Sequence, residues 1–204
     1  MHHSIKYLAT AVALGFVATA SAQMHSTSPV RIRGDIVSAS KDALVVHRRS
    51  GDTVSIALKP DVKIAAVRKI SLADIKPGSF VGAAARADVN GNLIAQEVLV
   101  FPESERGTGE GHYAWDLGSN STMTNANVDA VVKASNDNVL QLSYKDGNNS
   151  VTVPPNAPVV TLIPASSADL TAGKKVFVVS AVGANHSYQA LQIVVEKDGV
   201  APPM

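Results

Sequence analysis

The chain of 204 residues contains no cysteine, a single tryptophan and few other aromatic residues. The lack of cysteine excludes disulfide bonds, thiolate nucleophiles and cysteine zinc sites. Basic and acidic residues nearly balance, and the resulting formal net charge of +1 argues against a general nucleic-acid-binding protein. The sequence also lacks the G-x-S-x-G, H-E-x-x-H and Walker signatures, so we expect no enzymatic activity.

The first 22 residues are typical of an export signal. Lys6 precedes an apolar run at residues 7–20, and Ala20-Ser21-Ala22 supplies the small residues that signal peptidase needs before Gln23. The apolar run is shorter than the roughly 20 residues of a membrane-spanning helix, and no later run is longer. The pattern therefore predicts a cleaved signal peptide at residues 1–22, a periplasmic or secreted protein, and no membrane span in the mature chain.

The rest of the chain matches itself when it is shifted by 95 positions. The sequence "SLADIKPG" at 71–78 aligns with "SSADLTAG" at 166–173, and each predicts one helical turn with a serine cap and an exit glycine. Apolar residues alternate with polar or small ones at 53–58 and 139–144, which predicts β-strands. We therefore expect an all-β protein with two tandem barrels like the oligonucleotide/oligosaccharide-binding (OB) fold, related by internal duplication. A β-sandwich is the alternative.

These patterns predict an order of parts along the chain. Strands are expected near 31–38, 43–49, 53–59, 64–67, 80–87 and 93–101, and in the same order from about 127 to 197. The expected parts are a flexible N-terminus at 23–29, a first barrel at 30–101, a Gly-rich linker at 102–125, a second barrel at 126–198 and a tail at 199–204. The first barrel has an excess of basic residues and the linker an excess of acidic ones, so the two should attract each other weakly.

The expected linker carries the only tryptophan, Trp115, within "RGTGEGHYAWDLGSNSTMTN". Tyr113, Trp115 and Leu117 occupy alternate positions, so in an extended chain their side chains point to the same side. A loop of this length in a compact protein needs anchors, and large aromatic side chains provide them. We expect these three residues to fill the groove between the two barrels and to clasp the barrels together.

Several stretches together resemble a known family. They are "SLADIKPGSFVG", "AQEVLVFPE", "RGTGEGHYAWDL", "STMTN" and the C-terminal "DGVAPPM". The chain resembles exported bacterial proteins built from two copies of a small β-domain of unknown function, and the resemblance covers nearly all of the mature chain. Ala114 stands where that family often has proline. The resemblance implies a tandem β-domain fold and brings no established activity.

A metal site is the alternative interpretation of some of these residues. His112, Trp115 and Met123 form a candidate soft-metal set, because Cu(I) favours imidazole and thioether ligands and an indole face can cover a cation. The sequence therefore leaves two hypotheses open. One is a non-catalytic binding or envelope-assembly module, whose partner is an unknown envelope protein or a small ligand. The other is a periplasmic copper-binding protein.

The N-terminus left by signal cleavage offers a second candidate metal site. Cleavage after Ala22 would expose Gln23, Met24 and His25. A free amine, two backbone amides and a histidine in third place can form the square-planar nitrogen site that suits Cu(II) or Ni(II). The alternative is a terminus without a ligand, because chain ends are commonly loose.

Overall fold

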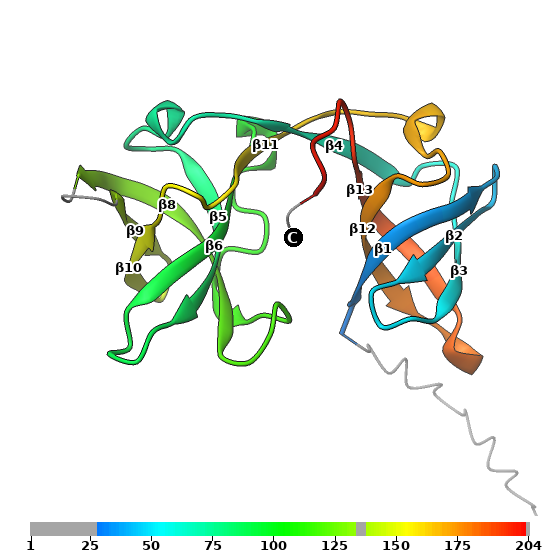
Figure 1. Ribbon diagram of the computed structural model, residues 1–204, viewed down its shortest axis with the longest axis horizontal. Helices are drawn as coiled ribbons and strands as arrows, with labels where there is room; N and C mark the ends of the chain where they lie inside the picture. The colour runs from blue at the N-terminus through cyan, green and yellow to red at the C-terminus, as the bar shows by residue number, and fades with distance from the viewer. Residues whose placement is uncertain (1–27, 134–137, 203–204) are drawn as a thin grey trace, which may run out of the picture.

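The computed structural model describes residues 28–133 and 138–202, which form β-strands connected by turns and single 3-10 turns (Figure 1). The all-β prediction is confirmed. Within the described part of the chain, no helix is long and apolar enough to cross a membrane. The expected signal peptide and the Gln23-Met24-His25 site lie outside the described residues.

The strands of the first half of the chain agree closely with the expected ranges. They are β1 (Val30–Ala39), β2 (Ala43–Arg48), β3 (Thr53–Ala57), β4 (Lys63–Lys69), β5 (Phe80–Ala87) and β6 (Leu93–Val100). The following strands are β7 (Gly111–Ala114), β8 (Ser121–Lys133), β9 (Asn138–Tyr144), β10 (Gly147–Val153), β11 (Val159–Pro164), β12 (Lys175–Val182) and β13 (Tyr188–Val195). In β1, β2 and β3 buried and less buried residues alternate, which is the period-two pattern of a strand with one face in the core.

Five of the strands close into a barrel, which we call the β1 barrel. Its order is β1-β2-β3-β13-β12, and β12 pairs with β1 to complete the ring. All pairs are antiparallel except β3 with β13, which is parallel. The inward-facing residues are aliphatic and nearly inaccessible to solvent, among them Ile32, Leu44, Val46, Ile56 and Ile193. Burial of this apolar set is the main force that holds the barrel closed.

A second ring of five strands, which we call the β8 barrel, has the same pattern. Its order is β8-β9-β10-β6-β5, and β5 pairs with β8 to complete the ring. The pair of β10 with β6 is again the parallel one. Its interior is formed by a second aliphatic cluster that includes Val81, Val98, Val128, Leu140 and Leu142.

The two barrels do not coincide with the expected boundaries at 30–101 and 126–198. The β1 barrel takes β12 and β13 from the second segment, and the β8 barrel takes β5 and β6 from the first. The reason lies in β4 and β11, which run between the barrels and pair antiparallel with each other (Figure 1). Each also lies parallel to a barrel strand, β4 beside β13 and β11 beside β6. Because these strands run outward instead of turning back, each segment crosses to the other barrel.

The two expected helical turns form as 3-10 turns, η1 (Leu72–Asp74) and η3 (Ser167–Asp169). Ser71 caps the first turn, and Asp74 accepts a hydrogen bond from the Ser71 backbone, which completes a capping box. Ser166 and Asp169 repeat the same arrangement in the second turn. Both turns come directly after a crossing strand, so they redirect the chain into the barrel that it joins.

The expected linker at 102–125 contains regular structure, which is a further correction. Residues 121–125 belong to β8, and β7 pairs with them as a hairpin. We call residues 102–120, which precede β8, the strap. Arg106 ties the strap to the β8 barrel by donating hydrogen bonds to Asn127 Oδ1 at 2.7 Å and to the Gly78 carbonyl oxygen at 2.8 Å. The sequence did not predict this strand pairing. The two strands of the hairpin are polar and glycine-rich, and apolar residues do not alternate along both of them.

Candidate functional site between the barrels

Burial alternates along the strap as the sequence predicts. Tyr113, Trp115 and Leu117 are partly buried, whereas His112 and Asp116 on the opposite side are exposed. Tyr113 lies in β7, and Trp115 follows it directly, with its backbone N–H donating to the Ser121 carbonyl oxygen at 2.8 Å. The extended hairpin therefore sends the two aromatic rings toward the same side of the strap.

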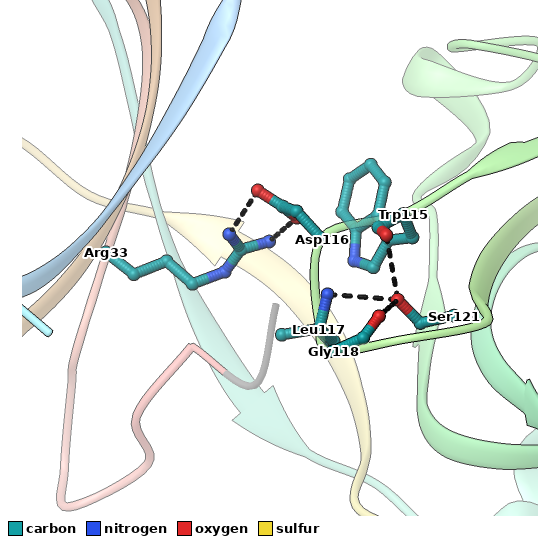
Figure 2. A network of polar contacts seen from close by, with 6 residues as sticks. All are labelled: Arg33, Trp115, Asp116, Leu117, Gly118 and Ser121. Carbon is teal, nitrogen blue, oxygen red and sulfur yellow. Dashed lines mark hydrogen bonds and ion pairs between the residues drawn. The ribbon is translucent and has the colours of Figure 1, made fainter. Parts of the chain in front are cut away.

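The tip of the strap reaches the β1 barrel through an ion pair (Figure 2). The two terminal nitrogens of Arg33 donate to the two Asp116 carboxylate oxygens at 2.9 and 2.8 Å. This is the bidentate geometry in which guanidinium–carboxylate pairs are strongest. Burial raises the pKa of Asp116, but the hydrogen bond and charge of Arg33 outweigh that effect, and the pKa lies below its usual value. Asp116 is therefore ionised at neutral pH.

Ser121 holds the turn that carries Asp116 (Figure 2). Its Oγ accepts a hydrogen bond from the Leu117 backbone N–H at 3.1 Å. The same Oγ lies 2.8 Å from the Trp115 carbonyl oxygen and 2.9 Å from that of Gly118, so its single proton can be donated to either. The side chain is almost fully buried. One serine thus keeps the turn compact and presents Asp116 toward Arg33.

The indole of Trp115 lies among groups from both barrels. The guanidinium carbon of Arg31 is 3.9 Å from the ring centroid, which is cation–π geometry, and the Tyr113 ring is 6.1 Å away at an interplanar angle of 59°. Trp115 also packs against an apolar cluster between the barrels that includes Leu99 of β6 and Phe177 of β12. Its Nε1 is buried and has no hydrogen-bond partner within the described residues.

A cavity of about 400 Å³ lies beside Trp115, between the barrels. Its wall is mostly apolar and combines residues of the β8 barrel, the β1 barrel, the strap and β11. They include Leu99, Phe101 and Met123 from the β8 barrel, Phe177, Val179 and Val194 from the β1 barrel, Tyr113 and Trp115 from the strap, and Leu162 from β11. This volume falls within the range of small-molecule sites, which are largely apolar with a few polar groups.

Asn125 supplies a buried polar group to this wall. The residue is 6% exposed, and its Nδ2 donates to the Thr108 carbonyl oxygen at 2.9 Å and to Tyr113 Oη at 3.2 Å. Its Oδ1 is buried and without a partner in the described part of the chain. Gly82 is the paired residue on β5, and a Cβ at that position would lie only 2.7 Å from Oδ1. Glycine at 82 therefore keeps the space beside this free acceptor open.

Glu97 of β6 is a second buried polar group in this region. Only 2% of the residue is exposed, and its Oε1 has no partner within the described residues. Burial raises the pKa of Glu97 to about 8, although the charges of Arg33 and Arg49 lower it and that of Asp116 raises it. The carboxyl group is therefore mostly protonated at neutral pH, as expected for an acid removed from water.

The structure separates the residues of the candidate copper set. His112 pairs with Thr124 across the β7–β8 hairpin and Met123 pairs with Tyr113, so the two side chains lie on opposite faces. His112 Nδ1 is 2.8 Å from Thr124 Oγ1 and 3.0 Å from Asn149 Nδ2, whereas Met123 is buried in the cavity wall. Within residues 28–133 and 138–202, no group of three or more His, Cys, Asp or Glu side chains is placed to hold a metal ion.

Sequence reasoning missed several residues of this site, namely Arg31, Arg33, Gly82, Glu97 and Asn125. The two arginines alternate with inward-facing apolar residues, which is also the pattern of an ordinary solvated strand face. A usable signal was present for Glu97. It lies in "LIAQEVLV", a nearly continuous apolar run, and such runs are typical of strands covered on both faces.

Comparisons of the chain with models of protein families, with curated proteins and with solved structures found no match. The resemblance to the exported tandem-domain family therefore stays a prediction. The features that indicate a function are the cavity, the strap that forms part of its wall, and the charges next to it.

Proposed function

We propose that the protein is an exported, non-catalytic binding module that holds a small, largely apolar ligand in the cavity between its barrels. The observation that carries this proposal is the composition of the cavity wall. It presents aromatic and aliphatic side chains from both barrels together with Asn125 Oδ1, a buried acceptor that has no partner in the described residues. An apolar ligand with one hydrogen-bond donor would fill the space and satisfy that acceptor. Export depends on the predicted signal peptide at residues 1–22.

We also infer that the two barrels are duplicated OB-like units that have exchanged strands. The ring orders β1-β2-β3-β13-β12 and β8-β9-β10-β6-β5 are the same, and each has one parallel pair at the same step. Irregular pairings recur at corresponding places, between Val179 and Ser180 in β12 and between Ala84 and Ala85 in β5. The two capping boxes match as well. A short Greek-key barrel with these features supports the OB-like interpretation.

In this proposal the strap has two roles, as clasp and as wall. It is anchored on the β8 barrel by Arg106, and it contacts the β1 barrel through Asp116 and Trp115. Trp115 and Tyr113 also line the cavity, so the contacts that join the barrels shape the ligand site. A binding site built this way is largely formed before the ligand arrives, which lowers the entropic cost of binding.

Copper binding remains the second hypothesis from the sequence, but the described residues do not favour it at the strap, since His112 and Met123 lie on opposite faces of the hairpin. The remaining copper candidate is the predicted N-terminus at Gln23, Met24 and His25, outside the described residues. The two hypotheses differ in location, so one set of variants can separate them.

The test uses an uncharged apolar fluorophore, N-phenyl-1-naphthylamine, titrated into the mature protein. Trp115 is the only tryptophan, and it lines the cavity, so energy transfer from its indole reports binding there. We expect saturable binding of one fluorophore per chain. Val179→Phe fills part of the cavity and should weaken binding by about tenfold or more, the effect of losing roughly 1.4 kcal/mol. Val132→Phe is the matched control, because Val132 is exposed and is not part of the cavity wall.

Two results would contradict the proposal. One is an absence of saturable fluorophore binding to the wild type. The other is equal binding by the Val179→Phe and Val132→Phe variants, which would place the fluorophore elsewhere. A parallel titration of the mature protein with Cu(II), with His25→Ala as its control, tests the copper hypothesis separately.

A further inference from the structure

A second cavity adjoins the first and differs from it in charge. It measures about 370 Å³ and is lined by Arg31, Arg33, Arg48, Arg49 and Ser50 of the β1 barrel and by Asp116 and Leu117 of the strap. We call it the arginine pocket. Four arginines line one small space, and guanidinium is the protein group best suited to planar oxyanions.

The positive charge of the arginine pocket is only partly balanced. Arg48 is paired with Asp52, and Arg33 is paired with Asp116. Arg31 stacks on Trp115, and neither Arg31 nor Arg49 forms an ion pair with any other described residue. The nearby Glu97 carboxyl adds little negative charge at neutral pH, because burial raises its pKa to about 8.

Within the arginine pocket, Arg33 is held in place and already binds one anion, the carboxylate of Asp116. Its side chain is only 9% exposed, and Nε is buried without a partner in the described part of the chain. The guanidinium lies 4.9 Å from the centroid of the Phe177 ring and 5.7 Å from that of Trp115, so the two rings restrict its orientation. The Asp116 carboxylate that occupies it is far more exposed, at 44%, and sits on the turn of the strap. Asp116 therefore occupies the position that an oxyanion of a ligand could take.

The two cavities share a wall. Arg31 lines both of them, and its guanidinium covers Trp115, which lines only the apolar one. Asp116 and Leu117, which line the arginine pocket, follow directly after Trp115 in the chain. One molecule can therefore place an apolar chain in the first cavity and a charged group in the second.

We propose that the arginine pocket binds the oxyanion head group of a small amphiphile whose apolar chain occupies the cavity between the barrels, and that the head group displaces Asp116 from Arg33. This inference rests on the proposed function, because it assigns the ligand class of the same site. Displacement exchanges one bidentate carboxylate for another oxyanion at Arg33, and it adds Arg31 and Arg49 as new charged partners. The free Asp116 side chain then returns to solvent.

The test compares three probes on the mature protein, namely decyl phosphate, 1-decanol and inorganic phosphate, the first two below their aggregation concentrations. We expect decyl phosphate to bind at least about tenfold more tightly than 1-decanol, because only the phosphate uses the arginines. Inorganic phosphate should bind much more weakly than decyl phosphate, because it lacks the apolar chain. This arm distinguishes a head-group site from a site for free phosphate.

Three variants refine the test. Arg49→Gln should remove much of the preference for decyl phosphate over 1-decanol, whereas Arg68→Gln, at an exposed arginine on β4 away from the pocket, should keep it. Asp116→Asn should strengthen the binding of decyl phosphate relative to that of 1-decanol, because the carboxylate that competes for Arg33 is gone. All three side chains are at least partly accessible, so these changes should be tolerated by the fold.

Each outcome has a distinct meaning. If neither decyl probe binds, the proposed function fails, and this inference fails with it. If both decyl probes bind equally to the wild type, or if Arg49→Gln behaves like Arg68→Gln, the apolar cavity stands and the head-group site is overturned. Inorganic phosphate that binds as tightly as decyl phosphate would also overturn the amphiphile assignment.

Discussion

The interiors of the two barrels are alike, but the sides that they turn toward each other are not. Arg33 of β1 pairs with Phe177, and Asn125 of β8 pairs with Gly82, so Arg33 and Asn125 hold equivalent positions in the two rings. In the same way, Arg31 corresponds to Met123. The β1 barrel thus faces the interface with two arginines and a phenylalanine, where the β8 barrel has a methionine, an asparagine and a glycine.

A third difference between the two barrels lies in β6 and β13, which occupy the same place in the two rings. Glu97 of β6 corresponds to Gln192 of β13, because Val98 and Ile193 follow them in the two barrel interiors. A barrel needs the same apolar interior whatever it faces, whereas its outer side is free to change. The symmetry of the fold therefore lies in the barrel interiors, and the candidate site lies where the two barrels differ.

The largest expected effect comes from truncating a side chain in the interior of a barrel. Ile193→Ala in the β1 barrel should lower the free energy of unfolding by about 4 kcal/mol, because Ile193 is fully buried and its truncation leaves a void. Since each barrel contains strands from both halves of the chain, the two barrels should unfold in one transition. Urea denaturation followed by circular dichroism and by Trp115 fluorescence checks this, and the two curves should coincide.

The equivalent change in the other barrel is Val98→Ala, which also truncates a fully buried side chain. It should give a smaller loss in the same single transition. Two separate transitions in either variant would show that the barrels are independent, and this would contradict the role given to the exchanged strands.

The next largest effect concerns Glu97 and pH. Its pKa is about 8 in the folded protein against an ordinary value of 4.5. Between these pH values the folded state keeps a proton that the unfolded chain has released, so this group lowers the free energy of unfolding by about 1.4 kcal/mol for each unit of rising pH. The stability linked to the protonated form is fully present below pH 4.5 and lost as pH rises to about 8. Glu97→Gln, which copies Gln192, should remove this slope and stabilise the protein by about 3 kcal/mol at pH 7.

The measurement is a series of urea denaturations between pH 4.5 and 8 for the wild type and the variant. Glu105→Gln is the control, because it removes a carboxyl group of the same kind from the strap, away from Glu97. A wild-type slope that survives in Glu97→Gln would show that another group causes it.

The smallest of the three effects concerns the strap. Trp115→Ala should lower the free energy of unfolding by about 2 kcal/mol, less than for a fully buried tryptophan, because the ring is only partly buried. Trp115→Phe should cost less, since it keeps an aromatic ring against Arg31. Circular dichroism follows both variants, and Val89→Ala, at a fully exposed position, provides the baseline. An unchanged urea midpoint in Trp115→Ala would count against the clasp.

Much of the fold could be predicted from local patterns. Period-two alternation located the strands from β1 to β6, and the repeated Ser-x-x-Asp located both capped turns. The distribution of each half's strands over both barrels could not be predicted in this way. An inward-facing set of residues from either half of the chain fits the same kind of interior, so the pattern does not say which half completes which ring. The choice depends on β4 and β11 running outward instead of turning back, which is a tertiary property.

The candidate site was predicted only in part. Alternation along the strap located Tyr113, Trp115 and Leu117, because it depends on neighbouring residues alone. Arg33 and Asp116 lie 83 positions apart, and the excess of charge in the two segments indicated attraction without naming the pair. Met123 was a candidate metal ligand in the alternative interpretation, and it lies in the apolar wall of the cavity. Its role depends on which face of the hairpin is covered, and that is decided by the other barrel.

The pairing of β4 with β11 joins the two barrels through backbone hydrogen bonds. A hinge that opened the space between them would have to break the pairing of β4 with β11 and that of both strands with β13 and β6. The width of that space is therefore set by backbone pairing, whereas the strap is held to the β1 barrel by side-chain contacts, which are easier to break than a strand ladder. A cut between the two halves of the chain would release no separate domains, because the pieces would stay interlocked.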